Sequence, residues 1–214
     1  MSIEIHSQTL GLASTNTYLI GDTTLNEAIL IDPVDDAPTL FEWASQLGWT
    51  IRMILATHAH FDHVLASAPL KQRTQAPFYI HQEAVPMLNN LPQTGLRFGN
   101  ELFPAAAVPD AYLEDEQIIS LGDIQLTCLY TPGHAPGHIA FYLASERVVF
   151  SGDTLFAGSI GRTDLPGSHL PTLLKSIRTR LLTLDDDVKV LSGHLEATTI
   201  GQERKHNPYL LGTR

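Results

Sequence analysis

The segment that decides the fold reads Thr57-His58-Ala59-His60-Phe61-Asp62-His63. It follows an apolar run at residues 51–56 that predicts a strand, so the cluster begins where that strand ends. Neutral imidazole and carboxylate are ligands for zinc and other first-row divalent metals. Because alternate side chains of an extended segment share a face, His58 and His60 can hold one ion together. A helix beginning at Asp62 would turn Asp62 and His63 to another side, where they can hold a second ion.

The bulk composition bounds the class of protein. The chain has 214 residues, 43% hydrophobic and 17% charged, which is ordinary for a globular protein with a substantial core. The formal net charge of −10 disfavours nucleic acid and membrane surfaces as partners, because both are negatively charged. No signal peptide and no bilayer-spanning run is visible. The single cysteine, Cys128, cannot form an internal disulfide, and its apolar surroundings predict a packed, unreactive thiol. Together these features predict a cytoplasmic protein.

Strand-like and helix-like segments interleave along the whole chain, and nothing marks a boundary between two domains. We therefore predict one domain over residues 1–214 with a layered α/β fold. The expected strands cover residues 3–9, 17–20, 28–31, 51–56, 77–80, 124–130, 139–143, 147–151 and 188–191. The expected helices cover residues 37–47, 62–74, 82–89 and 169–182. Residues 91–110 are rich in Pro, Gly and Asn and predict a long surface loop.

Three later segments place a further candidate ligand directly after an apolar strand and a glycine. These candidates are His134, Asp153 and His194. Glycine before each one lets the backbone approach a crowded centre. Ligands collected from several strand ends suit a rigid site at one edge of a sheet. His81 also follows a strand, but a loop residue is the simpler interpretation there, as it is for His169.

Residues 57–63, 131–134, 152–156 and 193–194, in this order, resemble the motifs of the metallo-β-lactamase superfamily. The resemblance runs from about residue 14 to about residue 209. It implies a four-layer αββα sandwich with the metals at one edge. Within the superfamily, residues 158–164 and 198–204 resemble the short glyoxalase II-like hydrolases, which are hydroxyacylglutathione hydrolases without a separate helical domain.

The resemblance implies a role for each ligand. The first metal would be held by His58, His60 and His134, the second by Asp62, His63 and His194, and Asp153 would bridge the two beside a hydroxide. Asp153 and Asp62 would be the catalytic carboxylates, one bridging and one orienting that hydroxide. The cofactor is then a pair of divalent ions, for which we expect zinc, with iron and manganese accepted by the same ligands.

The function that this resemblance implies is thioester hydrolysis by a dinuclear metal site. The expected partner is a small-molecule thioester, hydroxyacyl-glutathione and above all S-D-lactoylglutathione. A different activity of the same fold would be that of a persulfide dioxygenase, with a single iron at His58, His134 and Asp153. The fold is also compatible with a lactonase or β-lactamase-like hydrolase, and the ligand set with a metal-binding scaffold without turnover.

Several residues outside the ligand set carry expectations of their own. Asp32 is expected to cap a turn or to support a ligand histidine, and His138 to be structural. Arg162 either pairs with Asp164 and fixes the loop after Asp153, or meets a substrate carboxylate as a substrate-binding residue. Glu203 and Arg204 are expected to form structural ion pairs, and the three aspartates at 185–187 a solvated turn.

The sequence departs from the family pattern directly after the last candidate ligand. The family usually has Gly and Pro after this histidine, whereas this chain has Leu195 and Glu196. The ligand itself is retained. Because the loop borders the expected substrate, the departure bears on substrate identity more than on metal binding.

Overall fold

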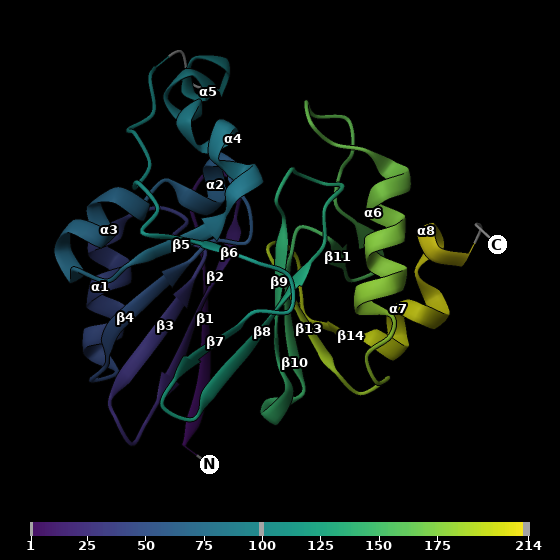
Figure 1. Cartoon of the computed structure of the whole chain (residues 1–214), viewed down its shortest axis with the longest axis horizontal. Coiled ribbons are helices and arrows are strands. Elements are labelled where there is room, and N and C mark those ends of the chain that lie inside the picture. Colours follow the sequence, from purple (N-terminus) through teal and green to yellow (C-terminus); the bar gives the residue numbers. More distant parts are fainter. Residues whose placement is uncertain (1, 99–100, 212–214) are drawn as a thin grey trace. The chain divides into compact units, whose positions relative to one another are not determined.

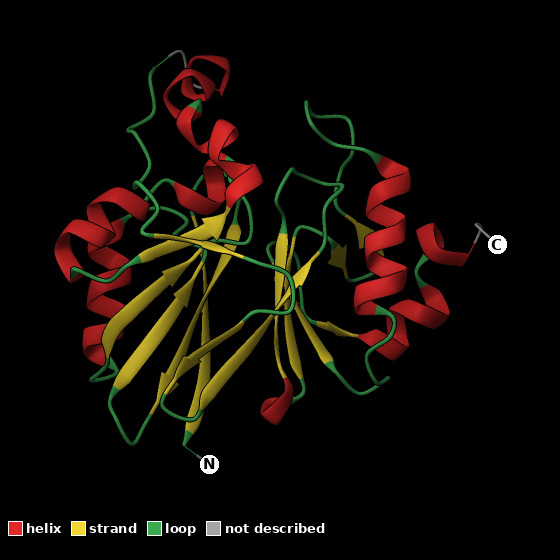
Figure 2. Ribbon diagram, viewed as in Figure 1, coloured by secondary structure: helices red, strands yellow, loops and turns green. Residues whose placement is uncertain are grey.

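A computed structural model describes residues 2–98 and 101–211 of the chain. The chain divides into two compact units. The first contains the residues up to Leu113 together with 120–124, and the second contains 114–119 together with the residues from Gln125 onward. Each unit has its own β-sheet and helices (Figure 2). The expectation of one domain over residues 1–214 stays a prediction. No helix among the described residues has the length and apolar character needed to cross a bilayer.

The sheet of the first unit has six strands in chain order. They are β1 Ile3–Leu10, β2 Thr15–Asp22, β3 Glu27–Ile31, β4 Thr50–Leu55, β5 Phe78–His81 and β6 Ala111–Leu113. The pairs β1–β2 and β2–β3 are antiparallel, whereas β3, β4, β5 and β6 run parallel. Parallel strands end at the same edge of a sheet, so the loops that follow Ile31 and Leu55 are neighbours. Asp32 and the histidine cluster both lie in these loops.

The helices of the first unit are α1 Ala37–Gln46, α2 Phe61–Val64, α3 Ser67–Thr74, the 3₁₀ turn η1 Gln82–Ala84, α4 Val85–Asn89 and α5 Leu91–Phe98. Helices α1 and α3 lie beside β4 (Figure 1), and the core there contains Leu40, Leu70, Ile54 and Phe78, all fully buried. The side chain of Asp36 caps α1 by accepting a hydrogen bond from the backbone N–H of Thr39 at 3.2 Å.

Two expectations for the first unit are wrong. The helix expected over residues 62–74 is interrupted, because the backbone N–H of Ala66 donates to the carbonyl of Pro33 at 3.0 Å instead of continuing the helical ladder. The loop expected over residues 91–110 begins with α5 instead, in which Pro92 occupies an early position that tolerates proline. Gly95 allows the chain to fold back closely, since a Cβ there would lie 2.3 Å from the carbonyl oxygen of Glu101. Residues 99–100 of the expected loop lie outside the described residues.

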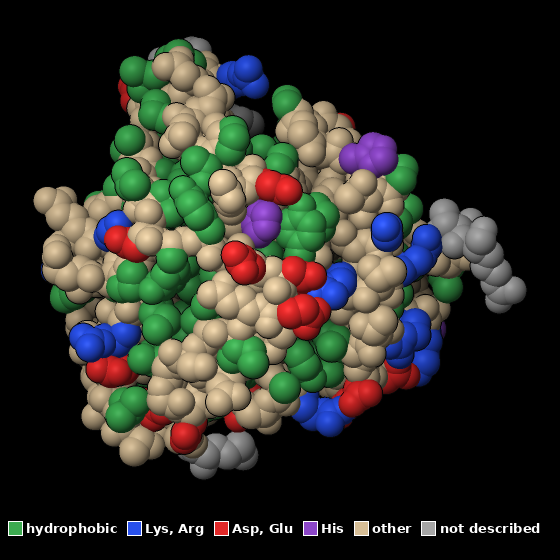
Figure 3. All heavy atoms as spheres, viewed as in Figure 1, with side chains coloured by type: hydrophobic (Ala, Val, Ile, Leu, Met, Phe, Trp, Pro, Cys, Tyr) green, Lys and Arg blue, Asp and Glu red, His purple; other side chains and the backbone are tan. Residues whose placement is uncertain are grey.

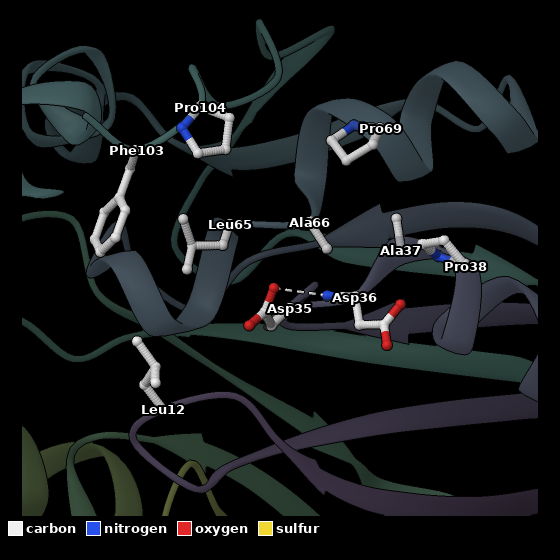
Figure 4. A pocket seen from close by; sticks show the side chains of 10 residues that line it. All are labelled: Leu12, Asp35, Asp36, Ala37, Pro38, Leu65, Ala66, Pro69, Phe103 and Pro104. Carbon is white, nitrogen blue, oxygen red and sulfur yellow. Dashed lines mark hydrogen bonds between the residues drawn. The ribbon is translucent and has the colours of Figure 1, made fainter. Parts of the chain in front are cut away.

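A shallow cavity of about 400 Å³ opens in the first unit beside the start of α1 (Figure 4). Leu65, Pro69 and Phe103 contribute apolar walls, and the Asp35 carboxylate accepts a hydrogen bond from the backbone N–H of Asp36 at 2.7 Å. None of the predicted metal ligands lines this cavity. The cavity is therefore a feature of the α1 end of the unit and not of the histidine cluster.

The sheet of the second unit has the order β14-β13-β10-β9-β8-β7. The strands are β7 Ile118–Leu121, β8 Ile124–Tyr130, β9 Ile139–Leu143, β10 Val148–Gly152, β13 Lys189–Ser192 and β14 Thr198–Thr199, with a separate hairpin of β11 Leu155–Phe156 and β12 Ser159–Ile160. Strands β10 and β13 run parallel, so Asp153 and His194 both follow strands that end at one edge. Cys128 is fully buried in β8, and desolvation by this burial, with a contribution from the Asp115 carboxylate, raises the pKa of its thiol to about 12. The thiol is therefore packed and unreactive, as expected.

The helices of the second unit are the 3₁₀ turn η2 Ala144–Glu146, α6 Leu170–Ser176, the π-helical turn η3 Ile177–Leu181, α7 Ile200–His206 and α8 Pro208–Leu211. One face of this helical segment is apolar, with Leu173, Ile177 and Leu181 fully buried in one core. The register changes within the expected helix 169–182, because the N–H of Leu182 donates to the carbonyl of Ile177, five residues back, at 2.8 Å.

The expected ion pairing in the second unit is confirmed for Arg204 but not for Glu203. Arg204 pairs with Asp186, and Arg147 pairs with Asp185 and Asp187, so the aspartate turn is held by arginines. Glu203 instead accepts hydrogen bonds while buried. On the face drawn in Figure 3, basic and acidic side chains lie beside one another in several places.

Candidate metal site

The histidine cluster of the first unit begins in an extended segment after β4. Nε2 of His58 lies 2.9 Å from Nδ1 of His60, and the two rings meet edge to face with centroids 4.6 Å apart. His58 is fully buried, and His60 is partly exposed at the start of α2. The alternation of the extended segment therefore directs one nitrogen of each ring toward a common point.

Helix α2 begins at Phe61 and gives the next two candidates a different direction. Nε2 of His63 lies 3.5 Å from Oδ2 of Asp62, and the ligand atoms of both residues lie within 4.8 Å of each other. The hydroxyl of Thr15, in β2, donates to Oδ2 of Asp62 at 2.7 Å. Thr15 therefore fixes the orientation of this carboxylate.

The Asp32 carboxylate orients residues of this cluster through three hydrogen bonds. Its buried carboxylate accepts from the backbone N–H of Thr57 at 2.7 Å, from the Thr57 hydroxyl at 2.9 Å, and from Nδ1 of His63 at 2.8 Å. Since the carboxylate is only an acceptor, Nδ1 of His63 carries the proton and Nε2 keeps its lone pair. Asp32 thus supports His63, a candidate ligand, which agrees with one of the two roles expected from the sequence.

Asp32 also determines the tautomer of His58, and it does so through Thr57. The Thr57 hydroxyl gives its proton to Asp32, so its oxygen accepts from Nδ1 of His58, 3.0 Å away. Nε2 of His58 then also keeps its lone pair. One buried carboxylate therefore sets the tautomers of two rings.

In the second unit, His134 lies in the loop after β8. Gly133 precedes it with φ +130°, and a Cβ on Gly133 would lie 2.2 Å from the backbone N of Leu173, so this turn requires glycine. Nδ1 of His134 donates to the backbone carbonyl of Arg162 at 2.8 Å. Nε2 therefore keeps its lone pair, and it lies 3.5 Å from Oδ2 of Asp153.

Asp153 follows β10 and is positioned through its backbone. Its N–H donates to Nε2 of His138 at 3.0 Å, so Nδ1 of His138 donates in turn to the Thr131 hydroxyl at 2.9 Å. Gly161 packs against Asp153 so closely that a Cβ there would lie 1.9 Å from the Asp153 carbonyl oxygen. His138 is fully buried and structural, as expected.

His194 follows β13 and meets the same carboxylate. Its Nε2 lies 3.4 Å from Oδ2 of Asp153, and its ring lies edge to face with Phe156 at a centroid distance of 6.1 Å. Oδ2 of Asp153 is therefore approached by two imidazole nitrogens within one unit.

These separations suit a shared cation. Two atoms that each bind one tetrahedral ion at about 2.1 Å stand about 3.4 Å apart. The distances from Asp153 to His134 and His194, and from Asp62 to His63, are 3.4–3.5 Å. The facing atoms are carboxylate oxygens and imidazole nitrogens, and their number and kind fit divalent metal ions. The clusters of both units therefore indicate divalent metal binding.

Arg162 contributes its backbone to the candidate site, and its side chain pairs with Asp164. Nε and Nη2 of Arg162 each donate to one oxygen of the Asp164 carboxylate at 2.7 Å. The hydrogen bonds from Arg162 are the largest cause that lowers the pKa of Asp164, to about 2. The geometry favours the first of the two interpretations of Arg162, and substrate binding by its side chain stays a prediction.

His81 and His169 bond to residues outside the candidate ligand set. His81 accepts from the N–H of Glu83 at 3.2 Å, and His169 bonds to the hydroxyl of Thr172 at 2.7 Å.

Three threonines hydrogen-bond to residues of the candidate site: Thr15, Thr57 and Thr131. None of them carries a signal of its own in the sequence, although Thr57 and Thr131 each lie within a recognisable motif.

Comparison with known proteins agrees with these features over nearly the whole chain. The profile of the metallo-beta-lactamase superfamily matches residues 10–194. Hydroxyacylglutathione hydrolase GloC of Haemophilus influenzae is 41% identical over 197 residues, which cover 91% of this chain and 92% of that protein.

Solved structures show the same fold. The crystal structure of BLEG-1 B3 metallo-beta-lactamase covers 98% of this chain and 100% of its own, with a TM-score of 0.92 and 37% identity. That of TTHA1623 in a di-iron-bound form covers 96% and 100%, with a TM-score of 0.85 and 37% identity. The expected fold class and the resemblance to short glyoxalase II-like proteins are thus confirmed, and the chain belongs to the metallo-β-lactamase superfamily.

Proposed function

We propose that this protein is a dinuclear metal-dependent thioesterase that hydrolyses hydroxyacyl-glutathione, with S-D-lactoylglutathione as its first candidate substrate. The observation that carries the proposal is the similarity to a hydroxyacylglutathione hydrolase at 41% identity over 91% of the chain. The divalent metals would be zinc, although a relative was crystallised in a di-iron form, so iron is the alternative.

The proposed ligand sets follow the family pattern. That pattern would assign His58, His60 and His134 to one metal, Asp62, His63 and His194 to the other, and Asp153 to both. The lone pairs at Nε2 of His58, His63 and His134, fixed by Asp32, Thr57 and the Arg162 carbonyl, support this assignment within each unit. When bound, such metals lower the pKa of water to about 7 and polarise a carbonyl oxygen.

In this proposal, residues of the chain supply negative charge and orient the attacking water. Asp153 brings a negative charge to a cluster of neutral imidazoles, and its backbone is fixed by His138. The Asp62 carboxylate, fixed by Thr15, is suited to orient the attacking water. Hydrolysis forms a carbon–oxygen bond and breaks the carbon–sulfur bond. Because the departing thiolate is a good leaving group, this function does not require a strong general acid.

A second candidate function is β-lactam hydrolysis. It is favoured by the 37% identity and TM-score of 0.92 to a structure described as a B3 metallo-beta-lactamase. Both reactions are an attack of water on an acyl carbon, and they differ in whether sulfur or nitrogen departs. Substrate preference therefore separates them better than the metal ligands do.

The test combines metal analysis with a substrate panel on one preparation. We expect two metal ions per chain and turnover of S-D-lactoylglutathione, measured beside other thioesters, in preference to a lactone and a β-lactam. One iron per chain with oxygen uptake on glutathione persulfide would instead establish a dioxygenase. No turnover of any glutathione thioester by metal-replete protein would refute the proposal.

A matched pair of variants checks that the chemistry depends on this cluster. His58→Ala removes a proposed ligand, and we expect it to lose metal and at least a hundredfold in kcat/KM. His81→Ala removes a histidine at the end of the neighbouring strand β5, which accepts a hydrogen bond from the N–H of Glu83. Wild-type activity in both variants would show that catalysis does not use the histidine cluster.

A further inference from the structure

Leu195 has a backbone conformation that is unusual for its side chain. Its φ is +66°, in the left-handed region, which is unfavourable for an aliphatic side chain. The other described residues of this kind, glycines aside, are all polar or charged: Ser14, Asn26, Asp32, Asp36, Gln75, Glu116 and Arg147. Leu195 is thus the aliphatic exception among the described residues.

The neighbouring residues hold Leu195 in this conformation. The buried hydroxyl of Ser192 donates to the carbonyl of His194 at 2.5 Å, and the N–H of Gly193 donates to the carbonyl of Gly152 at 2.9 Å. The first bond folds the carbonyl of His194 back toward β13, so the chain reverses at Leu195. Strain of this kind persists where the surroundings determine it, and it often marks a functional position.

The strain is not repaid by burial of the leucine side chain. Leu195 is 62% exposed, and Glu196 and Ala197 beside it are exposed as well. It directly follows His194, whose Nε2 approaches Asp153 at 3.4 Å. An apolar side chain is therefore presented to solvent one residue from a proposed metal ligand.

We propose that Leu195 is a specificity-determining residue, which contacts an alkyl portion of the substrate next to the scissile carbonyl. This inference rests on the proposed thioesterase function and adds a preference for thioesters with an apolar chain. The alkyl portion belongs either to the acyl group or to the thiol. In both cases the alkyl chain would cover apolar surface of Leu195 that is now exposed to solvent.

The experiment measures how kcat/KM depends on chain length. In one series the acyl group on glutathione grows from acetyl to hexanoyl, and in the other the thiol grows from ethanethiol to hexanethiol with the acyl group held as lactoyl. We expect wild-type kcat/KM to rise about two- to fourfold per methylene in one of the series, as for a methylene that is half to fully buried. Leu195→Asn, which keeps a side chain tolerated at positive φ, should abolish this rise.

Leu211→Asn is the matched control, because Leu211 lies in the same unit with a similar exposure of 60%. It should retain the wild-type dependence on chain length. Leu195→Gly, which relieves the strain, should melt no lower than wild type. A marked loss of thermal stability in this variant would show that Leu195 is a packing residue and would overturn the inference.

The outcomes also separate this inference from the function on which it rests. If wild type hydrolysed none of the thioesters, the thioesterase proposal would be wrong and the inference would fall with it. If wild type hydrolysed them and Leu195→Asn showed the same gain per methylene, only the role of Leu195 would be refuted.

Discussion

Asp32 lies outside the proposed ligand set, so its substitution tests how neighbouring residues set the tautomers of the candidate ligand histidines. We consider Asp32→Asn. Asparagine has nearly the same shape and tolerates the left-handed backbone of this residue, whose φ is +58°. The amide can still accept from the backbone N–H of Thr57. Its NH₂ group, however, would face Nδ1 of His63, where the carboxylate now accepts a hydrogen bond at 2.8 Å.

The magnitude follows from the tautomer. If the asparagine amide donates to Nδ1 of His63, the ring proton moves to Nε2, and the lone pair beside Asp62 is lost. Removing a partner that orients a metal-binding histidine costs about 10- to 100-fold in metal affinity, or about 1.4–2.7 kcal/mol. Loss of hydrogen bonds to a buried charged group lowers the free energy of unfolding by about 1.5–3 kcal/mol as well.

The assay is titration of metal-free protein with zinc against a chelator of known affinity, beside chemical unfolding of the same metal-free protein. Asp22→Asn is the control, because Asp22 is also buried and accepts from the backbone N–H groups of Thr24, Leu25 and Asp123. We expect both variants to be destabilised and only Asp32→Asn to bind zinc more weakly. Wild-type zinc affinity in Asp32→Asn would refute the argument from tautomers.

Three further outcomes are expected. Glu203→Ala should lower the free energy of unfolding by about 3 kcal/mol in urea titration. It removes a buried carboxylate that accepts three hydrogen bonds, from Gly158, Thr198 and Asn207, at 2.6–2.9 Å; a loss under about 1 kcal/mol would contradict this. Asp164 has a pKa lowered from 3.8 to about 2, so its contribution to stability should be present above pH 3.8 and be lost as the pH falls toward 2. Unfolding of metal-free wild type and Asp164→Asn across this range checks the sign, since the difference in stability should shrink on acidification and not grow. Chelation of the metals should lower both activity and Tm, and added zinc should restore both; an unchanged Tm would argue against metal binding in the folded state.

The sequence predicted those parts of the molecule that depend on local pattern. Alternation after β4 placed His58 and His60 together, and the turn into α2 redirected Asp62 and His63. Short strands such as β11 and β12, with two residues each, carry too little alternation to be recognised. They form because the hairpin is closed by its own pairing and held by the buried Glu203.

Other features were missed because distant groups decide them. The helix expected over 62–74 breaks at Ala66, whose N–H is taken by Pro33, a residue 33 positions earlier. Local propensity at Ala66 gives no sign of this competition. Likewise, nothing near His134 shows that its ring proton is held by the carbonyl of Arg162, which lies 28 residues later.

The two kinds of acceptor constrain the sequence differently. The ring of His134 is fixed by a backbone carbonyl, which any residue at position 162 supplies, so the Arg162 side chain can pair with Asp164 without affecting that hydrogen bond. The ring of His63 is fixed by a side chain, so position 32 must remain a carboxylate for Nε2 to keep its lone pair. A ligand motif therefore specifies which atoms can face a metal, whereas Asp32 and the Arg162 carbonyl determine whether those atoms carry a lone pair.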